Sequence, residues 1–283
     1  MTRNFEDSAR QIVVEGFNII SNPRVFFILR VLAITQNAYI CTIRFHGGSQ
    51  FLGPFETRLS EISKQKKSRV ILALDTIKSR EFDLEQARSF VQSVERYIVG
   101  VKLGLPAFAN LCQETKRLIQ SFPELPFIAD WKLADVPHTN RLVTQKLLKL
   151  GFSATIVHAV VGEDSLKEVK SVADEHSAGV VGVVAMSNSG ASTLNSLFDT
   201  LLQKCVRAGI KCFIAPATFP DIIRKTKQSV EECVVLSPGV GAQGGDSKLA
   251  VSAGADFLII GRSITDSENP EKQAQLEAQN SWR

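Results

Sequence analysis

Eight short apolar runs recur at regular intervals between residues 69 and 261, and stretches with helical spacing separate them. Runs this rich in β-branched residues, without polar alternation, are typical of strands buried on both faces of a parallel sheet that helices cover. Eight strand-helix units in about 215 residues fit a closed (β/α)8 TIM barrel. The strands are predicted at 69–75, 97–104, 126–131, 153–159, 179–186, 211–216, 233–239 and 256–261.

The intervening stretches carry the apolar spacing of amphipathic helices, most clearly at 83–97 and 139–151. The second of these ends at Gly151, and glycine is favoured where a helix terminates. An open doubly wound sheet is the alternative architecture. It is disfavoured because LDTIKSREFD follows the first strand, where a dinucleotide-binding sheet would carry a glycine-rich turn.

Residues 1–66 lack this alternation and contain no motif that can be assigned. We predict a poorly ordered N-terminal extension at 1–66 and a barrel domain at 67–283. One hypothesis is that the extension is an over-called start, with the natural start near Leu59 or Val70. The net charge of +4 is concentrated there, because residues 67–283 carry 25 basic against 24 acidic side chains. The basic run KQKK at 64–67 is interpreted as a solvated hinge, so no nucleic-acid partner is predicted.

The chain shows no clean membrane segment. The most apolar stretch, residues 25–43, is interrupted by Arg30, Gln36 and Asn37 and falls short of the roughly 20 apolar residues that a spanning helix needs. The five cysteines are odd in number and widely spaced, unlike a disulfide framework or a zinc site. We therefore predict no membrane association and a cytoplasmic location.

Charged residues gather where the predicted strands end. Asp75 closes the first strand, Lys102 the second, and Asp130 and Lys132 the third, with Asp135 just beyond. Since active sites of such barrels lie at the carboxyl ends of the strands, these side chains are expected to meet. Residues two apart on a strand share a face, and alternating ammonium and carboxylate groups offset the cost of burying charge. The alternative interpretation is a salt-bridge network that only stabilises the barrel mouth.

A glycine-rich segment follows the seventh strand, and an arginine follows the eighth. Barrels commonly bind phosphate after these two strands, with backbone N–H groups and a bidentate guanidinium as donors. The predicted phosphate-binding residues are Pro238, Gly239, Val240, Gly241, Ala242, Gln243, Gly244, Gly245, Gly261 and Arg262.

Two further polar residues follow strands and have less specific roles. His158 closes the fourth strand, where we favour a barrel-interior histidine with a satisfied hydrogen bond over a catalytic one. Ser187 follows the fifth strand, and a ligand contact and a helix cap are equally compatible with its position. No spacing of His, Cys or acidic residues suggests a metal site, and no Ser-His-Asp set is indicated.

These motifs resemble those of the orotidine 5′-phosphate decarboxylase family. DWKLADVPHT resembles its D-x-K-x-x-D-[IV]-x-x-T signature, and SPGVGAQGGD with IGRSI is similar to its phosphate-site pair. LALD and VKLG also match, so the resemblance spans about residues 69–266. HTN and PATFP are similar to the archaeal and short bacterial sequences. The extension before residue 67 and the loose match of VVAMSNSG depart from the pattern.

The resemblance implies loss of CO₂ from C6 of orotidine 5′-phosphate to give UMP, the last step of pyrimidine synthesis, with no cofactor. Lys132 would protonate C6, Asp130 would lie beside the substrate carboxylate, and Lys102 would bridge Asp130 and the ribose. Asp75 would hold a ribose hydroxyl. For the other groups the resemblance implies that Ser187 meets the pyrimidine, Gln243 links pyrimidine and phosphate, Gly261 and Arg262 hold the phosphate, and the loop near 243–248 is a lid.

The resemblance also implies a homodimer, in which Asp135 and Thr139 reach the neighbouring subunit's site. Two alternatives remain. A sibling enzyme, keto-gulonate-phosphate decarboxylase or hexulose-phosphate synthase, would use Mg²⁺ and a glutamate where this chain has Lys102, whose ammonium would repel the metal. A catalytically silent phosphate-ligand sensor would predict a broken charge set, whereas all its members are present.

Overall fold

The structure, a computed structural model, describes residues 26–28, 44–46 and 52–282. The chain divides into two units, Met1–Gln50 and Phe51–Arg283. In the first unit, β1 (Phe26–Ile28) pairs antiparallel with β2 (Arg44–His46). The extension was predicted to be poorly ordered over residues 1–66. Apart from β1 and β2, its part up to residue 51 lies outside the described residues.

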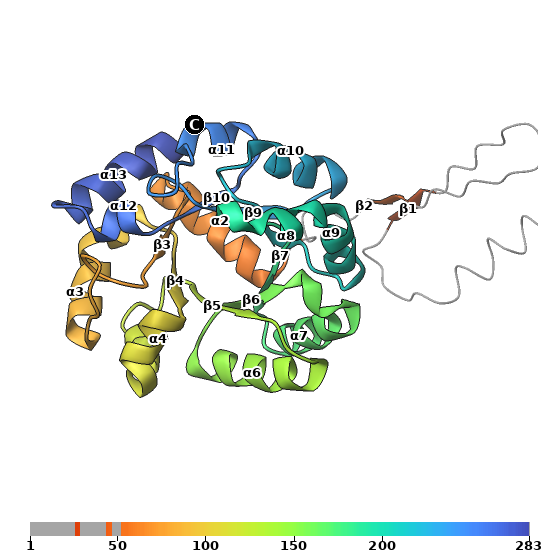
Figure 1. The fold of residues 1–283 in the computed structure, drawn as a ribbon. Coiled ribbons are helices and arrows are strands. Elements are labelled where there is room, and N and C mark those ends of the chain that lie inside the picture. Colours follow the sequence, from red (N-terminus) through yellow and green to blue (C-terminus); the bar gives the residue numbers. More distant parts are fainter. Residues whose placement is uncertain (1–25, 29–43, 47–51, 283) are drawn as a thin grey trace, which may run out of the picture. The chain divides into compact units, whose positions relative to one another are not determined.

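The second unit is a closed barrel of eight parallel strands, as predicted. Each strand pairs with its neighbours in chain order, and β10 closes the ring against β3. Figure 1 shows the strands surrounded by helices. All eight strands fall within the predicted runs or overlap them: β3 Val70–Ala73, β4 Gly100–Gly104, β5 Phe127–Leu133, β6 Ala154–His158, β7 Gly179–Val183, β8 Cys212–Ile214, β9 Val234–Pro238 and β10 Phe257–Ile260.

The helices begin and end where local sequence favours it. At the start of α3, Asp83 and Gln86 form a reciprocal capping box, and α6 ends at Gly151 with a φ of 107°. Both predicted helices are therefore confirmed. The helices are α2 Pro54–Lys66, α3 Leu84–Val94, α4 Leu105–Leu111, α5 Thr115–Gln120, α6 Pro137–Leu150, α7 Glu163–Glu175, α8 Ser192–Ser196, α9 Phe198–Arg207, α10 Pro220–Ser229, α11 Ser247–Ser252, α12 Arg262–Thr265 and α13 Pro270–Ser281.

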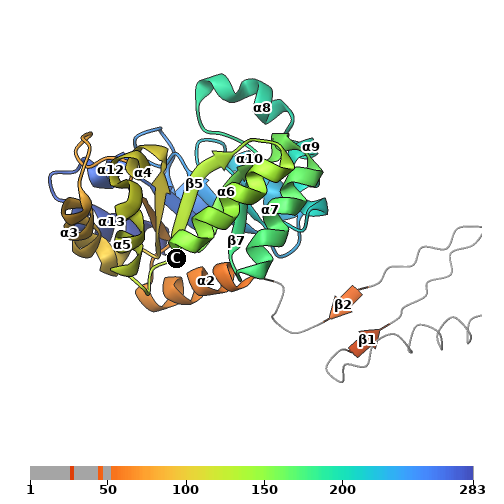
Figure 2. The ribbon, with the colours of Figure 1, turned by 90° about the horizontal axis from the view of Figure 1, so that it is seen from below.

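Apolar side chains form two layers of core. One lies between the strands and the surrounding helices, and the other fills the barrel interior, where Ile71, Ile128 and Leu236 are fully buried. This interior layer also includes Phe55 and Leu59 of α2. Figure 2 shows α2 across one end of the barrel and α8 at the opposite end.

Helix α2 corrects the predicted domain boundary. We assigned residues 54–66 to the poorly ordered extension, but they form a helix within the barrel's own unit. Phe55 packs so closely on β7 that a Cβ at Gly179 would lie 2.3 Å from its ring. The run at 64–67 is not a hinge either, because it forms the last turn and cap of α2, and Lys66 donates to the carbonyl oxygens of Glu95 and Ile98.

Four cysteines lie in the described part of the chain, and all four are free thiols: Cys112, Cys205, Cys212 and Cys233. Within the same part, no helix combines the length and hydropathy needed to cross a bilayer. Of the apolar stretch 25–43, only β1 is described. The cytoplasmic location inferred from cysteine use stays a prediction.

Candidate active site

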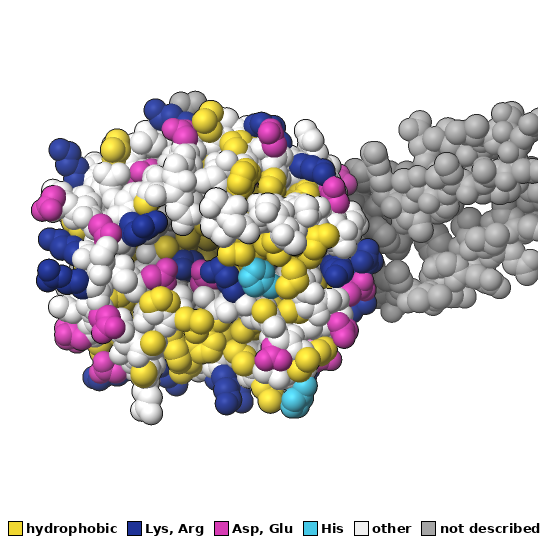
Figure 3. Space-filling view, in the orientation of Figure 1, with side chains coloured by type: hydrophobic (Ala, Val, Ile, Leu, Met, Phe, Trp, Pro, Cys, Tyr) yellow, Lys and Arg dark blue, Asp and Glu magenta, His cyan; other side chains and the backbone are white. Residues whose placement is uncertain are grey.

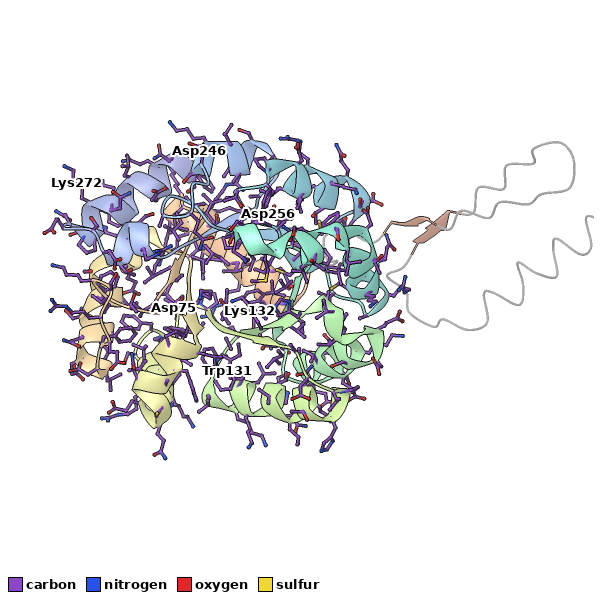
Figure 4. The ribbon with its side chains drawn as sticks, in the orientation of Figure 1. Asp75, Trp131, Lys132, Asp246, Asp256 and Lys272 are labelled. Carbon is purple, nitrogen blue, oxygen red and sulfur yellow. The ribbon has the colours of Figure 1, made fainter. Side chains whose placement is uncertain are left out.

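The charged side chains at the strand ends form one chain of ion pairs. Lys102 Nζ lies 3.0 Å from Asp75 Oδ2 and 2.8 Å from Asp130 Oδ2. Lys132 Nζ lies 2.8 Å from the other oxygen of Asp130. Carboxylate and ammonium groups therefore alternate along the four residues, which we call the charge array. In Figure 4, Asp75 and Lys132 lie toward the space that the strands enclose, and Trp131 lies toward α4, where its ring meets Phe108.

The two buried members of the charge array stabilise each other's charged form. Burial alone would lower the pKa of Lys102, but the nearby charges of Asp130 and Asp75 outweigh it, so the pKa lies above its ordinary value. Burial would likewise raise the pKa of Asp130, yet Lys102 and Lys132 hold it below its ordinary value. Both groups are therefore charged at neutral pH.

The backbone bends locally to build the charge array. Lys132 has a φ of 42°, in the left-handed region, and the register of β5 against β6 shifts between Ala129 and Leu133. Such a conformation costs about 1–3 kcal/mol in a residue with a side chain, and irregularities of this kind re-aim side chains beside active sites. Here the strained residue is Lys132, one of the two lysines whose ammonium groups meet Asp130.

Asp75 is fixed by the neighbouring strand. Its Oδ1 accepts the backbone N–H of Gly104 at 2.8 Å. A Cβ at residue 104 would lie 2.4 Å from that oxygen, so this close approach requires glycine. The carboxylate is thereby held so that its second oxygen, Oδ2, accepts from Lys102 Nζ.

The charge array faces a cavity of about 700 Å³ at the carboxyl ends of the strands. Apolar side chains on four strands also line it: Ile156, Val183, Ile214 and Ile259. Figure 3 shows acidic and basic side chains gathered in a hollow near the centre of this face. A cavity that combines the charge array with these apolar side chains is suited to a ligand that has both polar and apolar groups.

The predicted phosphate-binding segment lies across the cavity from the charge array. Pro238, Gly239, Val240, Ala242 and Gln243 line the cavity, whereas Gly241, Gly244 and Gly245 do not. The N–H groups of those three glycines are bonded to carbonyls inside the loop, so they shape it and are not free donors. Their left-handed or tightly packed backbone explains why glycine is needed, for example at Gly241 with a φ of 68°.

Gly261 and Arg262 also line the cavity, after β10. The Arg262 side chain is exposed, and within the described part of the molecule its guanidinium forms no hydrogen bond or ion pair. A guanidinium with uncommitted donors at this place can receive two oxygens of a phosphate.

Ser187 and Gln243 join the two sides of the cavity mouth. Ser187, in the loop after β7, donates from its Oγ to Gln243 Oε1 at 2.5 Å. Both residues line the cavity. Of the two open readings of Ser187, this position favours a ligand contact, because the α8 and 3₁₀ segments that follow show no side-chain cap from it.

The model of the orotidine 5′-phosphate decarboxylase / HUMPS family matches residues 68–276. The chain belongs to this family. It is 35% identical over 212 residues to the orotidine 5′-phosphate decarboxylase of Methanosarcina mazei, a match that covers 74% of this chain and 93% of the relative. It is 36% identical over 207 residues to the enzyme of that name in Pyrococcus furiosus, a match that covers 72% of this chain and 93% of the relative.

Solved structures of the same family agree with the fold. The Methanocaldococcus jannaschii orotidine 5′-monophosphate decarboxylase complexed with the inhibitor BMP superimposes with a TM-score of 0.70 at 31% identity, covering 76% of this chain and 99% of that one. The Pyrococcus horikoshii enzyme superimposes with a TM-score of 0.66 at 35% identity, covering 75% of this chain and 98% of that one. The prediction of an orotidine 5′-phosphate decarboxylase of the archaeal type is therefore confirmed.

Two residues of the family signature do not line the cavity of their own chain. Asp135 is exposed, and its Oδ1 accepts the N–H of Val136, while Thr139 lies in the first turn of α6. Asn140 holds this turn by donating to the backbone oxygen of Asp135. The roles predicted for Asp135 and Thr139 in a neighbouring subunit stay predictions.

His158 differs from its prediction in one respect. It is half-buried at the end of β6, as expected for a barrel-interior residue, but its buried Nδ1 has no hydrogen-bond partner in the described part of the chain. Burial, with the nearby Lys132 charge, lowers the pKa of His158, so the ring is neutral at pH 7. A histidine buried in this way is not a satisfied core residue.

Several cavity residues were missed from sequence. Thr76 and Thr265 flank the phosphate side, and Met186, Asn188 and Ser189 follow β7. The apolar wall could have been found from strand parity, because every second residue at a barrel strand end faces inward. The loop residues carried no such signal. Among the described residues, no cluster of three or more His, Cys, Asp or Glu side chains could hold a metal ion.

Proposed function

We propose that this chain converts orotidine 5′-phosphate to UMP without a metal ion, and that Lys132 is the proton donor to C6. The observation that carries the proposal is the unbroken charge array facing a cavity whose lining also includes the uncommitted Arg262. The C6–carboxylate bond breaks, CO₂ leaves, and its electron pair stays on C6. The Lys132 ammonium then gives a proton to C6, and the lysine regains one from water.

Asp130 favours departure of the carboxylate in this proposal. Its side chain is almost fully buried, and its pKa is held low, so it presents a fixed negative charge beside the leaving group. As CO₂ leaves, that repulsion falls while Lys132 remains to stabilise the charge at C6. Lys102 keeps Asp130 ionised and reaches the ribose, and Asp75 accepts from a ribose hydroxyl.

The phosphate end supplies binding energy far from the reacting carbon. Arg262, with Gly261 and the cavity-lining residues Pro238, Gly239, Val240, Ala242 and Gln243, would hold the phosphate, and Ser187 would meet the pyrimidine. Gly241, Gly244 and Gly245 act by keeping that loop in shape. Energy from the phosphate can drive closure of the loop near 243–248, which excludes water and strengthens the charge array.

The metal-free assignment rests on the donor set. A divalent cation at this end of the barrel would compete with the Lys102 ammonium, which lies between two carboxylates at 2.8 and 3.0 Å. The magnesium-dependent sibling enzymes would need that position to be acidic. The intact charge array likewise disfavours a silent phosphate sensor.

One assay separates these three functions. Loss of orotidine 5′-phosphate absorbance is followed with and without a metal chelator, and UMP binding is measured in parallel. We expect equal turnover in both conditions. If the chelator abolishes turnover, the chain is one of the magnesium-dependent sibling enzymes. If UMP binds but orotidine 5′-phosphate is not turned over, the chain is a sensor.

We also propose a homodimer with two composite sites. Asp135 and Thr139 do not line their own cavity, and Leu105, Val136 and Leu142 are exposed apolar side chains on the same helices and loops, α4, α6 and the turn before α6. Figure 3 shows apolar surface over this part of the molecule, around α4 and α6. Mixed Asp135→Ala and Lys132→Ala chains should regain activity through one intact site. No recovery after verified subunit exchange would contradict the shared site.

A further inference from the structure

The loop after β7 is held by one side chain at two points. Asn195, in α8, accepts the backbone N–H of Met186 at 2.9 Å through Oδ1 and donates to the Met186 carbonyl oxygen at 3.0 Å through Nδ2. Exchanging the two ends of the amide would place like groups against each other, so both bonds fix its orientation. The amide thus binds Met186 as a neighbouring strand would, beyond the point where β7 ends at Val183.

This attachment acts at the edge of the cavity. Met186 lines the cavity, and the next residue is Ser187, whose Oγ lies 2.5 Å from Gln243 Oε1. Asn188 and Ser189, which follow, also line the cavity. Figure 2 shows that α8 stands out from the end of the barrel, so the loop is held from outside the ring of strands.

We infer that Asn195 is a positioning residue for the pyrimidine end of the ligand. Its amide fixes the backbone of Met186 so that Ser187 faces both the ligand and Gln243. Asn195 lies outside the cavity lining, so it acts through Ser187 and not by contact with substrate. The inference rests on the proposed function of Ser187, and it assigns specificity to a residue of α8 that no strand-end pattern would reveal.

The test compares a ligand that has the pyrimidine with one that lacks it. Affinities of UMP and of ribose 5-phosphate are measured for the parent and for Asn195→Ala. Loss of two hydrogen bonds at the loop should weaken UMP binding by about 10-fold. Ribose 5-phosphate should change by less than about 2-fold, because Gly261, Arg262 and the charge array are untouched. A purely structural defect would weaken both ligands alike, and that result would overturn the inference.

Two further variants guard against misfolding. Asn195→Asp keeps the shape and the acceptor for Met186 N–H but sets an oxygen against the Met186 carbonyl, so it should reproduce the selective loss. Ser196→Ala is the matched control, since within the described part of the chain the neighbouring Ser196 hydroxyl donates only to the Thr193 carbonyl oxygen of the same helix. It should behave as the parent. Parental UMP affinity in both Asn195 variants would overturn the inference.

A double-mutant cycle identifies the route of the effect. In the Ser187→Ala background, Asn195→Ala should cost less than about 2-fold in UMP affinity, because the residue it positions is gone. Full additivity would contradict action through Ser187. The cycle uses binding alone, so it can succeed even if the parent fails to decarboxylate orotidine 5′-phosphate, which would reject the proposed reaction separately.

Discussion

The two ends of the barrel bury charge in opposite ways. At the carboxyl ends of the strands, four charged side chains neutralise one another within 3.0 Å contacts. At the other end, α2 inserts Phe55 and Leu59 into an apolar layer, and Glu56 is buried beside them. Among the described residues Glu56 forms no ion pair, and backbone amides of Gly53 and its own residue, together with the more distant Lys170 charge, only partly offset its burial.

The pKa values of the two buried carboxyls move in opposite directions. Lys102 and Lys132 hold the pKa of Asp130 low against burial, whereas burial raises the pKa of Glu56. The difference shows what a buried carboxylate needs to stay charged: ammonium groups in direct contact, not merely amide donors and a more distant charge. The end that has such ammonium groups is the end that faces the cavity.

The largest effect is expected from removing the central ammonium, in Lys102→Met. The buried Asp130 would then keep only Lys132 as an ammonium partner, and the half-buried Asp75 would lose Lys102, at a cost of about 3–5 kcal/mol in the free energy of unfolding. Turnover of orotidine 5′-phosphate should fall by on the order of 10³-fold. Steady-state kinetics and urea unfolding measure the two effects.

Lys66→Met is the matched control at the other end, because among the residues that the structure describes Lys66 donates only to carbonyl oxygens of Glu95 and Ile98. It should lower stability by about 1–3 kcal/mol and leave kcat unchanged. A comparable loss of kcat in both variants would erase the distinction between the two ends.

The next effect concerns the apolar end alone. Leu59 is fully buried in the barrel interior, so Leu59→Ala should lower the free energy of unfolding by about 2–5 kcal/mol. Because the charge array is remote from α2, kcat and KM should stay within about 2-fold of the parent below the melting transition. If stability were unaffected, α2 would not be part of the barrel core.

The smallest effect is expected from Glu56→Gln. Since burial raises the folded-state pKa of Glu56, ionisation costs stability once pH rises above the unfolded value of 4.5. Removing the charge should raise the melting temperature at pH 7 by about 2 °C, and the gain should vanish below pH 4.5. The pH dependence that Asp130 contributes has the opposite sign. Its folded-state pKa is lowered, so its contribution to stability is present above pH 3.8 and is lost at lower pH. A gain for Glu56→Gln that persists at pH 4 would contradict this account.

The sequence predicted the barrel well because its strands are apolar on both faces, and it predicted the charge array because polar residues at consecutive strand ends meet in any such barrel. It missed α2, whose inward face has only three large apolar residues, Phe55, Leu59 and the half-buried Ile62, and whose last turn is basic. The left-handed backbone of Lys132 and the attachment of Met186 to Asn195 depend on tertiary contacts, which no spacing encodes. The Glu56 environment was hidden for the same reason.

The central claim is that Lys132 delivers the proton at the charged end of the barrel. The most direct measurement is turnover of orotidine 5′-phosphate by Lys132→Ala, with UMP affinity determined on the same preparation. Turnover should fall by at least about 10³-fold, the range for loss of a positioned acid, while UMP still binds. A variant that turns over near the parental rate would contradict the account.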